Sequence, residues 1–363
     1  MTDWSSHRDL VTISDAILDQ VNHIEAIPMV VRDVAFEPRD PSIRLFLSSN
    51  ALREFPMGIV NIQHLTELSL RGNGLTELPP AVASLTSLVV LNVAQNRLRY
   101  LPGELLTLLD EGSKLQKLLI HPNPFFQVRG PTYCDYGASL YDHITFPPHT
   151  GTIETPTWIG ITTILRARSP VQFSDATLAI RSDFKLPLLS DDLDLENRKL
   201  DTEDFWVLST PRGFSFGDVS NRMGIWRELR GPSSLFELAL RAAVRHKYPE
   251  EVRSLLEGDD LPGHFLPAFD CASRLHKVGG QYCCVCKREM ACPATKWIEF
   301  RELHATTANG PGHALRYMSR SIMNSEEVLV PFLRNGCSWK CSPFKVGEPS
   351  GGRCVRTPLL VVP

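Results

Sequence analysis

Four cysteines in the C-terminal part of the chain have the spacing of metal ligands. Cys283 and Cys286 form a Cys-x-x-Cys pair, and Cys337 and Cys341 form a Cys-x-x-x-Cys pair about 50 residues later. Two thiolate pairs of this kind can coordinate one zinc ion tetrahedrally, with Zn–S distances of about 2.3 Å. Because four thiolates leave no position for water, we expect a structural rather than a catalytic zinc ion.

Other donors in the same region leave the ligand set open. Eight of the nine cysteines follow residue 270, and Cys134 is the only other one. In a reducing compartment such crowding indicates metal ligation rather than disulfides. Buried free cysteines without a metal are the alternative. The further donors that could replace one of the four ligands are Cys284, Cys292, Cys354, His304 and His313.

Strands are expected to position the two cysteine pairs. The segments at 295–300 and 328–333 are rich in the β-branched and aromatic residues that favour strands, and they lie between the two pairs. Two cysteine turns joined by strands predict a small ribbon-like zinc domain.

Helices are expected before this ribbon. Ser234 and Glu237 form a capping box at the start of a long apolar helix. A second helix is expected at 249–256, where proline suits the first turn, and a third at 266–276. The sequence therefore predicts a helical and cysteine-rich zinc-binding module over 231–363.

A repeat of 23 residues occupies the N-terminal part of the chain. Asn50, Asn73 and Asn96 keep this spacing, as do a proline six residues after each of them and several leucine positions. In the sequence L-x-x-L-x-L-x-x-N, alternation places the leucines on one face of a short strand. The asparagine can then satisfy backbone groups at the bend that follows. Since each unit is too small to have its own core, neighbouring units must stack.

This pattern resembles the leucine-rich-repeat family over residues 10 to 128, beginning with a degenerate unit at Asn22 to Pro28. The resemblance implies an α/β fold with a short leucine-rich-repeat solenoid at 1–128. The segment at 129–230 is rich in proline, serine and acidic residues, and Leu189 to Asp204 is strongly acidic. Such composition favours a flexible or partly disordered linker between the solenoid and the C-terminal module.

The variable strand positions of the solenoid are the expected partner-binding residues. Mixed charge, small polar side chains and a few apolar residues suit a protein or peptide partner. A merely solvated surface, with binding elsewhere, is the alternative. The three lanes of side chains are Arg44, Glu67, Val90 and Lys117; Phe46, Ser69, Asn92 and Leu119; and Ser48, Arg71, Ala94 and His121.

Composition and motifs argue against several other functions. The formal charge of −3 on 363 residues gives no general basic field for duplex nucleic acid. No segment approaches the ~20 apolar residues of a membrane span, and the first residues do not form a secretory signal. The phosphate-binding, dinucleotide-binding, zinc-protease and nucleophile-elbow motifs are all absent from the sequence. We therefore expect a non-enzymatic protein of the cytoplasm or nucleus.

The region from residue 233 to residue 341 also resembles the C-terminal part of some poorly characterised leucine-rich-repeat proteins. The resemblance is carried by Ser-Leu-Phe-Glu-Leu-Ala-Leu-Arg, the Cys-x-x-Cys pair, Lys-Trp-Ile-Glu-Phe and Val-Pro-Phe-Leu-Arg-Asn-Gly-Cys-Ser-Trp-Lys-Cys. It supports treating Cys283, Cys286, Cys337 and Cys341 as one ligand set. It implies no catalytic chemistry.

Three functions remain at this point. The first is an interaction scaffold that binds a protein of unknown identity through the concave face. The second is a substrate receptor of a ubiquitin ligase, because the helix at Ser234 and Leu235 resembles the box that binds elongin-type adaptors. In that pattern Ala239 stands where cysteine is preferred, and Ala243 fills the last aliphatic position. The third is nucleic-acid binding by the zinc module, where basic residues and aromatic residues are interspersed.

Overall fold

The fold is mixed α/β, and its parts are two compact units. Unit 1 comprises Met1–Ile164, Glu302–Val330 and Leu360–Pro363, and unit 2 comprises Leu165–Arg301 and Pro331–Leu359. Among the described helices, none combines the length and the apolar character needed to cross a lipid bilayer. The computed structural model describes residues 42–110, 112–128, 158–182, 184–186, 205–207, 234–257, 261–307, 329–343, 355–357 and 359–361.

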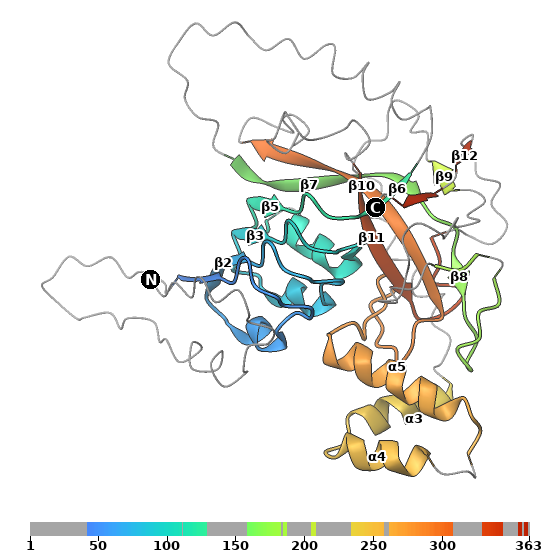
Figure 1. Cartoon of the computed structure of the whole chain (residues 1–363). Helices are drawn as coiled ribbons and strands as arrows, with labels where there is room; N and C mark the ends of the chain where they lie inside the picture. The colour runs from blue at the N-terminus through green and yellow to red at the C-terminus, as the bar shows by residue number, and fades with distance from the viewer. Residues whose placement is uncertain are drawn as a thin grey trace, which may run out of the picture. The chain divides into compact units, whose positions relative to one another are not determined.

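A parallel sheet forms one side of unit 1, and its strands lie side by side in Figure 1. The leucines of neighbouring strands are in register, Leu68 beside Leu91 and Leu91 beside Leu118, and all three are fully buried. This stacking is the reason for the 23-residue spacing between Leu68 and Leu91, while the next step, to Leu118, has 27 residues. The strands, in their order across the sheet, are β1 (Ile43–Phe46), β2 (Leu65–Ser69), β3 (Val90–Asn92) and β5 (Lys117–Leu119).

Short 3-10 helices form the return segments of unit 1. They are η1 (Met57–Asn61), η2 (Pro80–Ser84) and η3 (Gly103–Leu109). Each follows a proline with φ between −66° and −70°, which is the value that the proline ring favours. Ile59, Val82 and Leu105 of these helices are fully buried and complete the core behind the strands. The repeat unit expected before residue 42 lies outside the described residues.

The asparagines of the repeat satisfy the backbone at each bend, as the sequence predicts. The Asn96 side chain donates to the carbonyls of Leu70 and Val93 at 3.0 and 2.9 Å, and its Oδ1 accepts from Leu75 N–H at 3.2 Å. Asn73 repeats this pattern one unit earlier, donating to Leu70 and Leu47 carbonyls and accepting from Leu52 N–H. These side chains connect neighbouring units where no strand pairing exists.

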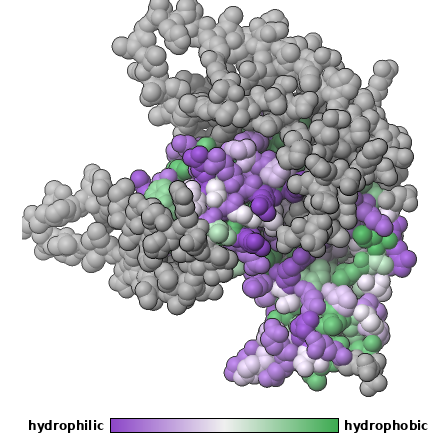
Figure 2. Space-filling model, in the orientation of Figure 1, coloured by the Kyte–Doolittle hydropathy of each residue, from purple (hydrophilic) through white to green (hydrophobic). Residues whose placement is uncertain are grey.

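Three helices form one part of unit 2: α3 (Leu235–Val244), α4 (Pro249–Leu256) and α5 (Phe265–Lys277). Ser234 Oγ accepts from Glu237 N–H at 3.1 Å, so the predicted N-cap is confirmed, whereas the Glu237 carboxylate accepts from Arg241 Nη2 and Ala291 N–H. The two later helices match their expected ranges within a residue. Leu240, Ala268 and Phe269 form their small core. Figure 2 shows hydrophobic residues among hydrophilic ones on the visible surface of these helices.

Strands form the rest of unit 2. The end of β7 (Trp158–Arg168), the start of β10 (Thr295–Thr307) and the end of β11 (Leu329–Gly336) are neighbours in one sheet, and β8 (Gln172–Phe173) pairs with β10. Unit 2 also contains β9 (Phe205–Val207) and β12 (Val355–Thr357). The other described strands are β4 (Leu101–Pro102) and β6 (Phe126–Val128) of unit 1 and β13 (Leu359–Val361), which begins at the last residue of unit 2.

The segment at 129–230, expected to be a linker, thus contains strands. Ser169 shows how they are held, because its Oγ accepts from the N–H of Ile298, 129 positions further along the chain. Its own N–H donates to the Ile298 carbonyl at 2.9 Å. The local composition indicated a linker and not strands, because the residues that stabilise these strands are distant in sequence.

Candidate metal centre and binding surface

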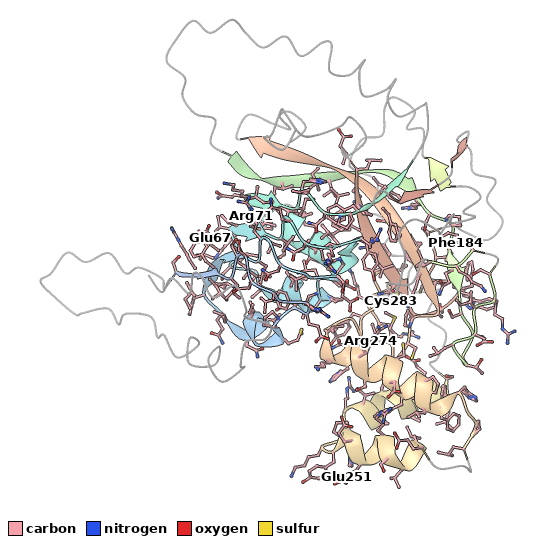
Figure 3. All side chains as sticks on the ribbon, in the orientation of Figure 1. Glu67, Arg71, Phe184, Glu251, Arg274 and Cys283 are labelled. Atoms are coloured by element: carbon pink, nitrogen blue, oxygen red, sulfur yellow. The ribbon has the colours of Figure 1, made fainter. Side chains whose placement is uncertain are left out.

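The four cysteines Cys283, Cys286, Cys337 and Cys341 meet in unit 2, with all four sulfur atoms within 4.8 Å of one another. Two of the Sγ–Sγ distances are 3.5 Å, between Cys286 and Cys337, and 3.7 Å, between Cys337 and Cys341. Tetrahedral zinc with Zn–S bonds of about 2.3 Å separates its sulfurs by about 3.8 Å. The cluster therefore has the size and the donor set of a metal site. Figure 3 labels Cys283 among these side chains.

A tight backbone turn shapes the first cysteine pair. The N–H of Lys287 donates to the Cys283 carbonyl at 2.9 Å, and Lys287 has a left-handed backbone with φ of 60°. The N–H groups of Cys286 and Cys337 both point to the Cys283 sulfur, at 3.5 and 3.4 Å. Donors arranged in this way favour a thiolate at Cys283.

Gly336 shapes the second cysteine pair at the end of β11. A Cβ atom at this position would lie 2.2 Å from the Cys341 carbonyl oxygen and 2.2 Å from Thr295 Oγ1. Those two atoms are themselves hydrogen-bonded, with Thr295 Oγ1 donating to the carbonyl at 3.0 Å. Only glycine leaves room for this contact, so Gly336 fixes the close approach of the Cys337 turn to the start of β10.

The negative charge of the cysteine thiolates favours a bound cation. Hydrogen bonds from Cys337 and Cys341 lower the pKa of Cys283, while the shared contact with Cys283 raises the pKa of Cys337 and raises that of Cys341 to about 11. One thiolate thus forms readily, and its negative charge opposes ionisation of Cys337 and Cys341. A divalent metal ion would balance these charges and displace the remaining protons. A bound metal ion would cross-link the turns that carry the two cysteine pairs.

The other expected donors do not join the cluster among the described residues. Cys284 packs instead with Val171 and Trp297. Cys292 lies beside α5, with its thiol 3.4 Å from the Ala268 carbonyl oxygen. The side chain of His304, together with His313 and Cys354, lies outside the described residues.

The first two lanes of expected partner-binding residues are in register on the parallel sheet of unit 1. Glu67 pairs with Arg44 on one side and with Val90 on the other, and Val90 pairs with Lys117. The second lane is aligned in the same way. Its members, in order across the sheet, are Phe46, Ser69, Asn92 and Leu119.

Side chains of these lanes contact one another across the strands. Arg44 Nε lies 3.7 Å from Glu67 Oε2, and the hydroxyls of Ser48 and Ser69 are 2.7 Å apart. Figure 3 labels Glu67 and Arg71, both on the strand side of unit 1. Two side-chain pairs therefore connect neighbouring repeats on this surface.

Exposure divides the expected residues into three groups. Arg44, Arg71 and Lys117 are exposed, whereas Ser69 and Ala94 are buried. The others are half-buried, namely Phe46, Ser48, Glu67, Val90, Asn92, Leu119 and His121. Burial lowers the pKa of His121 to about 4, and its ring contacts Phe125 edge to face. His121 is therefore a neutral part of the unit rather than a surface charge at neutral pH.

Sequence reasoning missed Gln95, which belongs to the same surface. Its Oε1 accepts from Arg71 Nε at 2.9 Å and holds the exposed guanidinium in place. Gln95 has φ of 57°, and Ser49 and Gly72, at the same position of the earlier repeats, have φ of 58° and 69°. Gly72, at the matching position of the earlier repeat, was the signal in the sequence that the backbone bends at Gln95 and places it beside the third lane.

Comparisons with known proteins give little further information. No family model matches the chain, and no curated protein is significantly similar to it. Among solved structures, a leucine-rich-repeat protein of Leptospira interrogans is 29% identical over 23% of this chain, with a TM-score of 0.20. The match spans 26% of that protein, so about a quarter of its length.

Proposed function

We propose that the chain is a non-enzymatic binding protein whose unit 1 is a leucine-rich-repeat solenoid that holds a protein partner on its strand surface. The observation that carries this proposal is the register of Arg44, Glu67, Val90 and Lys117 across four parallel strands. A row of side chains fixed at strand spacing, about 4.8 Å apart, forms a rigid surface that loses little entropy on binding.

The chemistry of the surface suits a protein with both charged and apolar contacts. Lys117 and Arg71 are exposed, and the apolar side chains of Phe46, Val90 and Leu119 are half-buried between polar neighbours. Partly exposed apolar groups inside a polar surround are typical of protein interfaces. The charged groups would steer association and select the partner.

Charge reversal tests this proposal. Native complexes captured with the wild-type chain should be lost with the double variant Arg44→Glu and Lys117→Glu. The matched control reverses Arg53 and Arg97, which are also exposed arginines of unit 1 but lie after the asparagine bends. Proteins that remain bound to the control and disappear from the strand variant support the proposal. The same proteins recovered from both variants would contradict it.

We also propose that unit 2 binds one structural zinc ion at Cys283, Cys286, Cys337 and Cys341. The sulfur geometry and the N–H donors around Cys283 support it. Elemental analysis of the purified chain should find close to one zinc per chain. Purified chain without metal, with all four thiols reacting at the rate of exposed cysteines, would contradict it.

A second candidate function is supported by helix α3. Leu235 is 83% exposed, although it stands in the first turn of an otherwise amphipathic helix. Leu238 and Ala239 are also exposed and lie on the same face, while Leu240 faces the core. Apolar residues at this spacing fit a helix that docks into a groove. They agree with the resemblance to the elongin-binding box of ubiquitin-ligase substrate receptors.

A direct titration separates this function from a plain scaffold. The full chain is titrated with a purified elongin adaptor pair, and Leu235→Asp should weaken binding at least tenfold. Leu255→Asp is the matched control, because Leu255 on α4 is 76% exposed. Absence of binding by the wild-type chain, or equal losses in both variants, would exclude the adaptor function.

A further inference from the structure

A second pair of cysteines in unit 2 is separate from the four-cysteine cluster. Cys271 stands in the middle of α5, and Cys292 lies shortly before β10. A hydrogen bond joins their two thiols. The Cys292 sulfur is also 3.4 Å from the carbonyl oxygen of Ala268, which is three residues before Cys271 on the same helix. Because residues three apart lie on one face of a helix, Cys292 contacts the face of α5 that carries Cys271.

The backbone on both sides of Cys292 is held by other elements of unit 2. The N–H of Ala291 donates to Glu237 Oε1 on α3 at 2.7 Å. The N–H of Ala294 donates to the carbonyl of Gly336, at the end of β11, at 2.9 Å. The Cys292 side chain packs against the small core of the three helices. The fold therefore holds the two thiols in contact, as disulfide formation requires.

The two thiols differ in acidity. The hydrogen bond from Cys292 lowers the pKa of Cys271 to about 6, against the effect of burial, and the positive charges of Lys296 and Arg274 act in the same direction. Figure 3 labels Arg274, which lies on α5 three residues after Cys271 and is exposed. The same hydrogen bond, burial and the charge of the Cys271 thiolate all raise the pKa of Cys292. Cys271 is therefore the thiolate of the pair at neutral pH, and the thiolate is the nucleophilic form of cysteine.

Both cysteines are also accessible to a small oxidant. Each is a free thiol and only half-buried, whereas Cys284 is buried. Susceptibility of a cysteine to oxidation follows its thiolate character and its exposure, and an adjacent second thiol converts the first oxidation product into a disulfide. Cys271 with Cys292 beside it meets these three conditions.

We propose that Cys271 and Cys292 form a reversible disulfide when hydrogen peroxide oxidises Cys271. In the first step the Cys271 thiolate attacks the peroxide, so that an S–O bond forms and the O–O bond breaks. The hydroxide that leaves becomes water by taking up the proton that the Cys271 thiol had released. The product is the sulfenic acid of Cys271.

In the second step the Cys292 sulfur attacks the Cys271 sulfur. An S–S bond forms, the S–O bond breaks, and the hydroxide that leaves takes the proton of the Cys292 thiol. In total, two thiols and one hydrogen peroxide give one disulfide and two water molecules. The sulfurs lose the two electrons that the peroxide gains. The disulfide ties α5 to the segment before β10 and closes a loop that contains the turn of Cys283 and Cys286.

Peptide mapping of the full wild-type chain by mass spectrometry tests this proposal. After brief treatment with hydrogen peroxide, the peptides that carry Cys271 and Cys292 should be joined, and dithiothreitol should separate them. The control is Cys284→Ser, which removes a buried cysteine that packs with Val171 and Trp297 and should form the same cross-link. Recovery of the two peptides unjoined, or joined to other cysteines instead, would overturn the proposal.

Single variants test the order of the two steps. Cys292→Ser lacks the second thiol, so a reagent specific for sulfenic acids should label Cys271 after peroxide treatment. Cys271→Ser should carry at least roughly tenfold less label on Cys292, because that thiol is protonated at neutral pH. Equal labelling of the two cysteines, or stronger labelling of Cys292, would overturn the assignment of Cys271 as the attacking thiolate.

Hydrogen exchange in the wild-type chain gives a measurement that does not depend on a variant folding. A cross-link restricts the open states of the segment that it closes, so the α5 amides should exchange at least roughly tenfold more slowly in the oxidised chain than in the reduced chain. The amides of β2 and β3 in unit 1 should not change. Equal exchange of the α5 amides before and after oxidation would contradict a cross-link at this place.

Discussion

Removing the Asn96 side chain should destabilise unit 1 far more than removing that of Asn50. Asn96 is buried and makes hydrogen bonds to the carbonyls of Leu70 and Val93 and to the N–H of Leu75. The carbonyls keep second donors from Asn73 and from Asn123, but the Leu75 N–H would be left buried without its acceptor.

The magnitude follows from these contacts. An orphaned buried N–H costs about 1–3 kcal/mol, and each ordinary lost hydrogen bond about 1 kcal/mol. We therefore expect Asn96→Ala to cost about 3 kcal/mol. Asn50 is half-buried and donates to the Leu47 carbonyl at 3.0 Å, so Asn50→Ala should cost about 1 kcal/mol.

Hydrogen exchange measured by mass spectrometry on the full chain is the assay, because it reads unit 1 separately from unit 2. A loss of about 3 kcal/mol accelerates exchange of the β2 and β3 amides by roughly 100-fold, against roughly fivefold for Asn50→Ala. Amides of α5 should not change in either variant. Equal acceleration by the two substitutions would refute the role assigned to the asparagines of the repeat.

Three further outcomes are expected. Cys286→Ser should lose bound zinc, while the adjacent Cys284→Ser should retain it, as measured by elemental analysis; loss in both would place the metal elsewhere. Gly336→Ala should displace the Cys337 turn and lower zinc affinity, whereas Gly263→Ala, where no atom lies within 4 Å of the added Cβ, should not. Burial raises the pKa of Glu299, but Arg334, Arg301 and Arg168 together lower this pKa from 4.5 to about 2. The ionised form of Glu299 therefore stabilises the fold above pH ~4.5, and this contribution is lost as the pH falls toward 2. The difference in unfolding free energy between wild type and Glu299→Gln should therefore shrink by ~3 kcal/mol from pH 5 to pH 2, and a constant difference in urea titrations would contradict it.

Local patterns in the sequence predicted the parts of the fold that depend on near neighbours. The 23-residue column of Leu45, Leu68 and Leu91 lies in register across the strands, because each stacked unit repeats the same strand and bend. Ser234 caps the start of α3, as its place before the apolar helix predicts. The spacing of the two cysteine pairs was enough to predict the cluster, because short turns bring paired thiols together. The cluster consists of Cys283, Cys286, Cys337 and Cys341.

Contacts between distant segments could not be predicted in this way. Nothing near Arg168 in the sequence indicates Glu299, which β10 brings beside it through long-range strand pairing. Ser69 was expected on the binding surface, but it is buried, and its hydroxyl contacts that of Ser48 in the turn after β1. The left-handed bend at Gln95 follows from the position of Gly72 in the repeat, yet its contact with Arg71 depends on side-chain geometry.

Site-specific photo-crosslinking tests the strand surface of unit 1 most directly. A photoreactive amino acid replaces exposed Lys117 in the first lane or, in a second chain, exposed Arg97 after the asparagine bend. A protein partner bound on the strands should be captured from position 117 and not from position 97. Equal capture at both positions, or capture at position 97 alone, would contradict a binding surface formed by the strands.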